Sequence, residues 1–233
     1  MKILIVEDEQ ELTKALLSYL KNEGYICESV QTFEDAQEKI HLYNYDMVVL
    51  DIGLPDGNGL DLLQQLKTQR SQSGVLIISA KNSLDDKLKG LDVGADDYIT
   101  KPFHLAELNA RIKSILRRRN FGGNREVIFE EIKINTDTFE THIQGKPIVL
   151  TQKEQELLLY FISNQNRVLT KESIAEHLWG DHMDMADSFD FIYTHIKNLR
   201  RKISQKGGNN YLQTVYGIGY KFTKQWNYSP KPP

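Results

Sequence analysis

The stretch VVLDIGLPDGNG, residues 48–59, joins an apolar run to an aspartate and then to a segment with three glycines. The apolar run is typical of a strand that is buried on both faces of a sheet, and Asp51 follows it directly. In parallel sheets, functional groups gather beyond the carboxyl ends of the strands. The stretch therefore predicts a parallel sheet that holds Asp51 at its chemical edge.

The residues around this stretch alternate between short apolar runs and amphipathic segments of helix length. The apolar runs are KILIV (2–6), YICESV (25–30), MVVL (47–50), VLIIS (75–79) and YIT (98–100). Helical segments are expected near 9–22, 33–43, 58–68, 83–92 and 104–119. This alternation predicts an α/β fold, a doubly wound five-stranded parallel sheet of the flavodoxin type with helices on both faces.

Polar side chains follow four of these runs, where the carboxyl ends of the strands meet. They are Glu7 and Asp8, then Asp51, Ser79 and Lys101. Clustered carboxylates repel one another unless a hard cation lies among them, and Mg²⁺ suits such oxygen ligands. Asp51 could then attack a phosphoryl group, while Lys101 balances charge and the Ser79 hydroxyl bonds an oxygen. We expect Pro102 to fix the chain after Lys101, and a cis peptide bond is one way to do so.

Four motifs of this half occur in one order: ILIVEDE (3–9), VVLDIGLPDGNG (48–59), IISA (77–80) and GADDYITKPF (94–103). Together they resemble the receiver domain of bacterial two-component response regulators, over about residues 1–118. The resemblance implies phosphoryl transfer to Asp51 from a phosphohistidine of a sensor histidine kinase. It assigns the Mg²⁺ ligands to Glu7, Asp8, Asp51 and the backbone carbonyl of Gly53.

Two receiver positions depart slightly from the common pattern, and a third carries the switch. Glu7 stands where many members have Asp, and Ser79 where Thr is commoner, but both keep the functional group. Tyr98 matches the switch aromatic, which rotates inward when Ser79 moves toward the phosphoryl group. A tyrosine suits this task because it has an apolar body and a polar tip.

The pattern changes after residues 119–126, RNFGGNRE, which predict a linker. Strand-like pieces at 127–135, 139–144 and 146–150 precede helical segments near 152–164, 171–178 and 186–205, and 211–222 indicates a hairpin. Thr151, with Glu154 three residues on, and Thr170 are predicted helix N-caps. We therefore expect a receiver domain at 1–118, a smaller α+β domain at 127–226 and a disordered tail at 227–233.

The segment SFDFIYTHIKNLRRKIS, residues 188–204, predicts an amphipathic helix with a basic face. Its buried stripe would comprise Phe189, Ile192, Ile196, Leu199 and Ile203. The polar face would carry Asp190, Thr194, Lys197, Asn198 and Arg201, with His195 and Arg200 at its borders. Every charged residue after Asp190 is Lys or Arg, which suits DNA. Lys and Arg bind guanine and Asn binds adenine in the major groove.

The second half resembles the winged-helix effector domain of OmpR/PhoB-type regulators. The motifs are LTQKEQELLLYF (150–161), LTKESIAEHLWG (169–180), HIKNLRRKI (195–203) and LQTVYGIGYKF (212–222). The resemblance implies a helix in the major groove of double-stranded promoter DNA, a hairpin on the backbone or minor groove, and a phosphate contact from Thr214. Tyr216 stands where many members have Arg, and Asn198 replaces a frequent Arg. The DNA sequence that relatives prefer therefore cannot be assigned to this chain. The acidic loop 180–188 is where such regulators meet RNA polymerase.

The resemblance also implies a phosphorylation-dependent homodimer through the fourth helix, fifth strand and fifth helix of the receiver. Complementary charges across two protomers would pair Lys87 with Glu107, Asp97 with Arg111 and Asp96 with Arg118, around Leu88, Leu91 and Ala110. Exposed pairs of this kind set register more than affinity. Two protomers imply two DNA half-sites about one helical turn apart, arranged as direct repeats.

Composition indicates in which compartment the protein works. The chain of 233 residues has a net charge of −3, no apolar run long enough for a bilayer, and no signal-peptide core at its N-terminus. Cys27 is the only cysteine, so we expect a reducing cytoplasm. The prediction is a transcription regulator and not an enzyme, with a receiver that catalyses only its own phosphoryl uptake and autodephosphorylation.

Two alternatives stay open. One is a Mg²⁺-dependent phosphatase with an aspartyl nucleophile, although Gly53 stands where the haloacid-dehalogenase type needs a second acid. The other is a DNA-binding regulator that acts without phosphorylation, which the complete receiver set argues against.

Overall fold

The structure is a computed structural model that describes residues 1–224 except 70, 72, 81–83, 137 and 181–188, and leaves out the side chains of 84–87. The chain divides into two units, Met1–Asn124 and Arg125–Pro233. Among the described residues, no helix combines the length and apolar character that crossing a bilayer requires.

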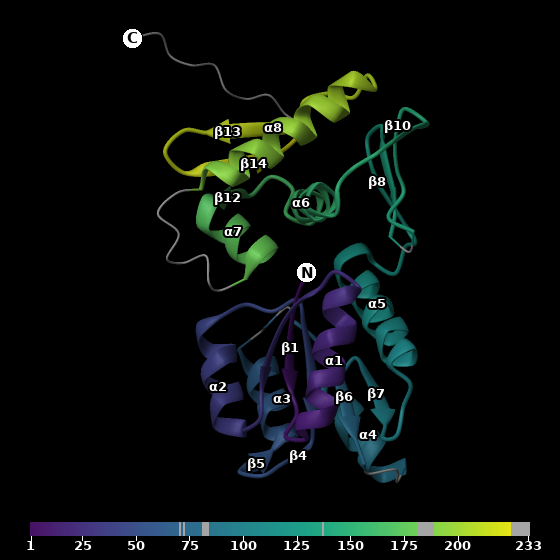
Figure 1. Ribbon diagram of the computed structural model, residues 1–233, viewed down its shortest axis with the longest axis vertical. Helices are drawn as coiled ribbons and strands as arrows, with labels where there is room; N and C mark the ends of the chain where they lie inside the picture. The colour runs from purple at the N-terminus through teal and green to yellow at the C-terminus, as the bar shows by residue number, and fades with distance from the viewer. Residues whose placement is uncertain (70, 72, 81–83, 137, 181–188, 225–233) are drawn as a thin grey trace. The chain divides into compact units, whose positions relative to one another are not determined.

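The first unit is a five-stranded parallel sheet in the order β2-β1-β3-β6-β7. Its strands are β1 (Lys2–Val6), β2 (Ile26–Val30), β3 (Met47–Asp51), β6 (Gly74–Ser79) and β7 (Asp97–Thr100). Its helices are α1 (Gln10–Asn22), α2 (Phe33–Leu42), α3 (Gly59–Thr68), α4 (Leu84–Val93) and α5 (Leu105–Phe121). α1 and α5 cover one face of the sheet, and α2 and α3 cover the other (Figure 1). The predicted doubly wound α/β fold is confirmed.

Alternation along the strands supplies both faces of this sheet with apolar side chains. In β1, Ile3 and Ile5 pack with Leu16 of α1, whereas Leu4 packs with Leu62 of α3. All residues of β1 and β3 are buried. Because burial on both faces fixes these strands firmly, the polar residues at their carboxyl ends have defined positions.

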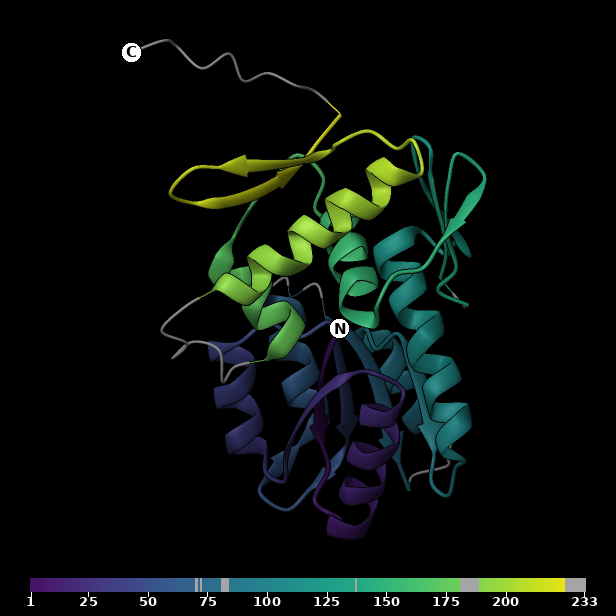
Figure 2. The same ribbon diagram turned by 45° about the horizontal axis from the view of Figure 1, so that its top comes forward.

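The second unit contains two antiparallel sheets, in the orders β11-β10-β9-β8 and β12-β14-β13. The strands are β8 (Glu126–Phe129), β9 (Ile132–Asn135), β10 (Thr141–Ile143), β11 (Lys146–Ile148), β12 (Val168–Thr170), β13 (Leu212–Val215) and β14 (Gly219–Phe222). The helices are α6 (Gln152–Ser163), α7 (Lys171–Trp179) and α8 (Asp190–Gln205). The β13–β14 hairpin, yellow in Figure 2, lies beside α8. This is the predicted α+β winged-helix arrangement.

Helix ends follow the predicted caps, but the linker is shorter than expected. Thr151 and Glu154 form a reciprocal capping box at the start of α6, and the Thr170 side chain caps α7. Residues 119–121, predicted as linker, form the last turn of α5, and Glu126 already belongs to β8. Gly122, with φ of 59° in the left-handed region, ends the helix. The predicted tail at 227–233 lies outside the described residues.

Candidate functional site

Three carboxylates meet at the carboxyl edge of the receiver sheet. Glu7, Asp8 and Asp51 each place an oxygen within 4.8 Å of the others. Glu7 follows β1 and is fully buried, Asp51 ends β3 with 6% of its surface exposed, and Asp8 is exposed. The fold thus brings together the acids that the sequence placed after two separate strands.

Lys101 supplies a cation to this cluster from the end of β7. Its Nζ lies 2.6 Å from Asp51 Oδ2 and 2.7 Å from Glu7 Oε1. Its backbone N–H donates to the Ser79 carbonyl at 2.8 Å, and the Lys101–Pro102 peptide bond is cis. Burial alone would lower the pKa of Lys101, but the hydrogen bonds to Asp51 and Glu7 outweigh it and raise that pKa. The lysine is therefore held as a cation on both acids.

Glu7 has an incompletely satisfied carboxylate. Its Oε2 is buried and lacks a hydrogen-bond partner among the described residues. Burial raises the pKa of Glu7, and the hydrogen bond from Lys101 opposes this rise only in part. A buried, unpartnered carboxylate oxygen beside two further carboxylates is the donor set that Mg²⁺ prefers. These residues therefore fit Mg²⁺.

The loop after Asp51 is held by contacts that the sequence analysis missed. The Gly53 N–H donates to Asp51 Oδ1 at 2.9 Å. The Asp56 carboxylate accepts the N–H groups of Phe33 and Glu34, at 2.7 and 3.0 Å, which lowers its pKa and anchors the loop to the start of α2. Aspartate followed by glycine signals only a turn, so nothing in the sequence indicated which helix Asp56 would contact.

Ser79 and Tyr98 occupy neighbouring strands beside the acids. Ser79 ends β6 and is 2% exposed, and Tyr98 lies on β7 opposite Ile77 with 7% of its surface exposed. A Cβ placed on Gly90 of α4 would lie 3.4 Å from the Tyr98 ring. The ring thus points inward, against the sheet and α4.

The predicted dimer residues share one surface of the receiver, but several of their charges pair within the chain. Leu88 and Leu91 of α4 are 47% and 43% exposed, and Ala110 of α5 is exposed. Arg111 binds Asp97 at 2.8 Å and Glu107 at 2.9 Å in the same protomer. The side chain of Lys87 lies outside the described residues.

Asp96, which we expect to face Arg118 of a second protomer, makes several contacts within its own chain. Its carboxylate binds Arg119, with Nε–Oδ1 at 2.8 Å and Nη2–Oδ2 at 2.9 Å, and it also accepts the Val75 N–H at 2.8 Å. Arg118, the expected partner across the dimer, reaches the Asp96 backbone carbonyl of its own chain at 3.1 Å. Asp96 is thus an internal link between β6 and the last turn of α5 rather than a free surface charge.

α8 has the expected two faces. Ile192, Ile196, Leu199 and Ile203 are buried, which confirms the apolar stripe except for Phe189, the half-buried N-cap. The exposed surface carries Thr194, Lys197 and Arg201, and Asn198 is partly exposed. His195 is half-buried, with its ring centre 5.4 Å from that of Trp179.

Two basic residues of α8 face inward, which the sequence did not reveal. Arg200, expected at the DNA surface, donates two hydrogen bonds to the Leu212 carbonyl of β13, at 3.1 and 2.7 Å. Lys202 Nζ lies 2.6 Å from Oε2 of Glu154 at the start of α6. Burial would raise the pKa of Glu154, but the hydrogen bonds from Lys202 and the Thr151 N–H lower it. Both cations therefore hold α8 in place.

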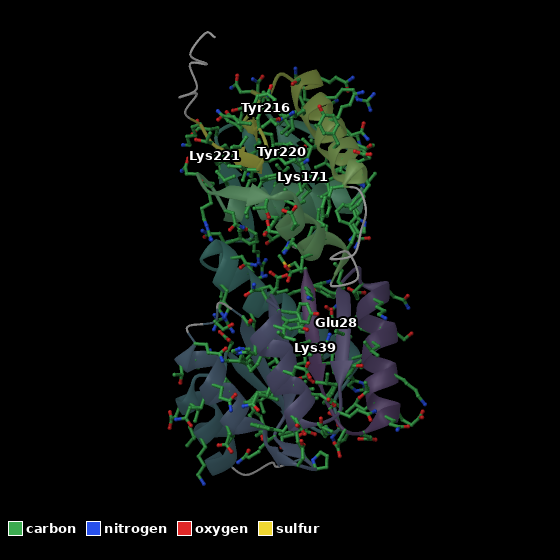
Figure 3. All side chains as sticks on the ribbon, turned by 90° about the vertical axis from the view of Figure 1, so that its left-hand side faces the viewer. Glu28, Lys39, Lys171, Tyr216, Tyr220 and Lys221 are labelled. Atoms are coloured by element: carbon green, nitrogen blue, oxygen red, sulfur yellow. The ribbon has the colours of Figure 1, made fainter. Side chains whose placement is uncertain are left out.

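The hairpin presents an uncharged tip. Tyr216, labelled in Figure 3, lies between β13 and β14 and is 84% exposed. Thr214 on β13 is also exposed. Tyr220 on β14 is buried, and burial raises its pKa. The acidic loop that we assigned to RNA polymerase lies, from residue 181 onward, outside the described residues.

Comparisons with known proteins match both units. Residues 3–113 match the family described as Response regulator receiver domain, and residues 145–222 match Transcriptional regulatory protein, C terminal. Transcriptional regulatory protein BasR of Escherichia coli is 39% identical over 94% of this chain and 96% of its own length. Transcriptional regulatory protein PmrA of Pectobacterium parmentieri is 37% identical over 96% of this chain and 98% of its own.

One solved structure is similar to this chain in sequence. Response regulator DrrB of Thermotoga maritima, described as an OmpR/PhoB homolog, is 32% identical over 95% of this chain and 98% of that chain, with a TM-score of 0.47. The two family models match the receiver and effector regions in this order, and both curated relatives match nearly the whole length of the chain. The chain belongs to the OmpR/PhoB family of two-component response regulators and is a transcriptional regulator.

Proposed function

We propose that Asp51 accepts a phosphoryl group from a phosphohistidine of a sensor histidine kinase. The observation that carries this proposal is the Lys101 ammonium, 2.6 Å from Asp51 and 2.7 Å from Glu7. A carboxylate oxygen of Asp51 forms the new bond to phosphorus, the P–N bond breaks, and its electron pair leaves with the imidazole. Lys101 and the Ser79 hydroxyl then bind the phosphoryl oxygens.

Glu7, Asp8, Asp51 and the Gly53 carbonyl are the residues that would hold Mg²⁺. When bound, the ion neutralises charge on the phosphoryl oxygens. The protein's own share of the chemistry is to fix the acids on rigid strand ends and to keep Lys101 charged. We propose that the receiver catalyses only its own phosphoryl uptake and autodephosphorylation.

Phosphorylation changes which partners the half-buried Lys101 and the buried Ser79 contact, and Tyr98 transmits that change to α4. We propose that the surface of α4, β7 and α5 then forms a homodimer around Leu88, Leu91 and Ala110. Arg111, Asp97 and Glu107 would exchange some of their bonds within one chain for bonds across the interface. Arg118 and Lys87 would also belong to that interface.

The second unit binds promoter DNA through α8 and the hairpin. Lys197, Asn198 and Arg201 would contact base edges in the major groove, with Thr194 and His195 nearby. Thr214 and Tyr216 would contact the backbone or the adjacent minor groove. A dimer would occupy two direct-repeat half-sites. We also propose a cytoplasmic location and RNA polymerase as a partner of the loop 180–188, both on the family resemblance.

The test is binding-site selection from random DNA with the unphosphorylated and the phosphorylated protein. We expect phosphorylation to enrich duplexes with two half-sites in direct repeat, because only the dimer binds both with high effective concentration. Asp51→Asn should remove uptake of phosphate from a small phosphodonor with Mg²⁺, and with it the enrichment. Asp61→Asn, a matched change of an exposed aspartate on α3, should leave both intact.

The outcomes also separate the alternatives. Equal enrichment by Asp51→Asn and wild type would favour a regulator that acts without phosphorylation. Continued labelling of Asp51→Asn would place the phosphoacceptor elsewhere. Sustained turnover of a phosphate ester would favour the phosphatase.

A further inference from the structure

Arg200 connects α8 to both strands of the C-terminal hairpin. Its Nε and Nη2 donate to the Leu212 carbonyl at 3.1 and 2.7 Å, and Nη2 also donates to Thr214 Oγ1 at 3.1 Å. The guanidinium carbon lies 5.9 Å from the ring centre of Tyr220 on β14. Tyr220 is the cross-strand neighbour of Thr214. One side chain of α8 therefore contacts both strands of the hairpin and helps to fix their register.

These contacts commit one edge of the guanidinium to the protein. Nε carries one hydrogen and Nη2 carries two, so three hydrogen bonds account for all three. The side chain is half-buried, with Arg201 exposed beside it. An arginine that is bound to a backbone carbonyl in this way serves first to place that backbone.

The bond to Thr214 also decides which way its hydroxyl points. A threonine hydroxyl has one hydrogen to donate and two lone pairs to accept. Because Oγ1 accepts the bond from Arg200, its own hydrogen cannot point at Arg200 and remains available to another acceptor. Thr214 is exposed, and no described residue accepts that hydrogen. The hydroxyl is thus set as a donor toward solvent.

We propose that Arg200 is a positioning residue for DNA binding, which orients the Thr214 hydroxyl as a donor to a DNA phosphate without contacting the DNA. The proposal rests on the DNA-binding function proposed above and replaces our expectation that Arg200 contacts DNA directly. A hydroxyl that donates to a charged phosphate oxygen makes a stronger bond than one that donates to a neutral acceptor.

The test measures the affinity of the phosphorylated full-length protein for the duplex recovered by site selection, at several salt concentrations. We expect Arg200→Met and Thr214→Val each to weaken binding roughly tenfold or more, the range for a hydrogen bond to a charged group. The double variant should be no weaker than either single one by more than about twofold, because both changes remove the same bond. Thr214→Ser, which keeps the hydroxyl, should bind as wild type does.

Salt dependence separates positioning from direct contact. Each cation that contacts a phosphate contributes about 0.9 to the slope of log affinity against log salt. We expect Arg200→Met to leave this slope unchanged. A fall of about 0.9, as for loss of one phosphate contact, would overturn the proposal, and so would losses that multiply in the double variant.

A second variant keeps the test decisive if Arg200→Met unfolds the effector unit. Arg200→Lys keeps the charge, but a single ammonium lacks the fork that reaches Leu212 and Thr214 together. We expect it to bind DNA as weakly as Thr214→Val, with tryptophan fluorescence like that of wild type. Affinity equal to wild type would overturn the proposal. Failure of the wild-type protein to bind any DNA would overturn the proposed function itself.

Discussion

Each unit contains a buried glutamate paired with a partly exposed lysine, and the two pairs have opposite consequences for the pKa of the acid. In the receiver, Lys101 lies 2.7 Å from the fully buried Glu7, and in the effector Lys202 lies 2.6 Å from the buried Glu154. Glu154 also caps α6, and its pKa is lowered. Glu7 keeps one buried oxygen without a partner among the described residues, and its pKa is raised.

The difference shows that a bound lysine alone does not make the charge of a buried glutamate stabilising. Glu154 has enough donors to offset its burial, so its charge stabilises the fold. Glu7 shares its lysine with Asp51, and its further donor, the Glu9 N–H at 3.3 Å, also binds Oε1, so Oε2 has no partner among the described residues. The buried charge of Glu7 is therefore held at a cost in free energy that a divalent cation would offset. The first arrangement suits a helix anchor, and the second suits a metal site.

The largest effect should follow from removing the shared lysine. Lys101→Met leaves Glu7 and Asp51 buried without a cation, which should lower the unfolding free energy of the receiver by ~3–5 kcal/mol without Mg²⁺. Added Mg²⁺ should restore much of the loss. Far-UV circular dichroism during urea unfolding measures this. Tryptophan fluorescence is the internal control, since both tryptophans lie after residue 125. A variant as stable as wild type in EDTA would contradict the comparison.

Replacing Glu154, the acid of the effector pair, should lower the unfolding free energy somewhat less, and the size of this loss should depend on pH. Glu154→Gln should lower the unfolding free energy of the effector by about 3 kcal/mol at pH 7, because Lys202 and the α6 cap lose their charged partner. The pKa of Glu154 is lowered, so its stabilisation is present above the unfolded value of 4.5 and is lost as pH falls through the lower folded value. The gap between variant and wild type should therefore close in acid. Tryptophan fluorescence during unfolding at several pH values checks this.

The same change at Glu7 should have a small effect of opposite sign. Its raised pKa means that the folded receiver loses stability as pH rises above 4.5 through the folded value. Glu7→Gln in EDTA should therefore unfold within ~1 kcal/mol of wild type at pH 7, on the stabilised side. Urea unfolding measured in parallel with Glu154→Gln tests this contrast. A loss as large as that of Glu154→Gln would make Glu7 a structural acid.

The exposed pair at the receiver surface should matter least. Arg111→Ala should weaken the phosphorylated dimer by about two- to fivefold, because a pair of this kind contributes up to ~1 kcal/mol. Labelling of Asp51 should not change. Sedimentation measures the dimer, and Lys113→Ala is the matched control, since Lys113 on the same helix binds Glu23 instead. An unchanged Arg111→Ala dimer would argue against this interface.

Most of the fold and much of the receiver site could be predicted because their signals are local. Apolar runs, helical periodicity and the residues that follow each run place Glu7, Asp8, Asp51, Ser79 and Lys101 without knowledge of distant contacts. Charges on helices were harder to interpret. Asp96 and Arg200 both looked like surface charges in the sequence, yet each has an internal partner.

The sequence by itself determined two units, a parallel α/β receiver and a winged helix, and the carboxyl-edge cluster of the receiver. It could do so because strand and helix periods are properties of neighbouring residues. Only the tertiary structure decided that Arg119 rather than Arg118 holds the Asp96 carboxylate, that α5 extends to Phe121, and that Arg200 turns toward the hairpin. A long charged side chain can reach several acceptors, and which one it binds depends on elements that are distant in sequence.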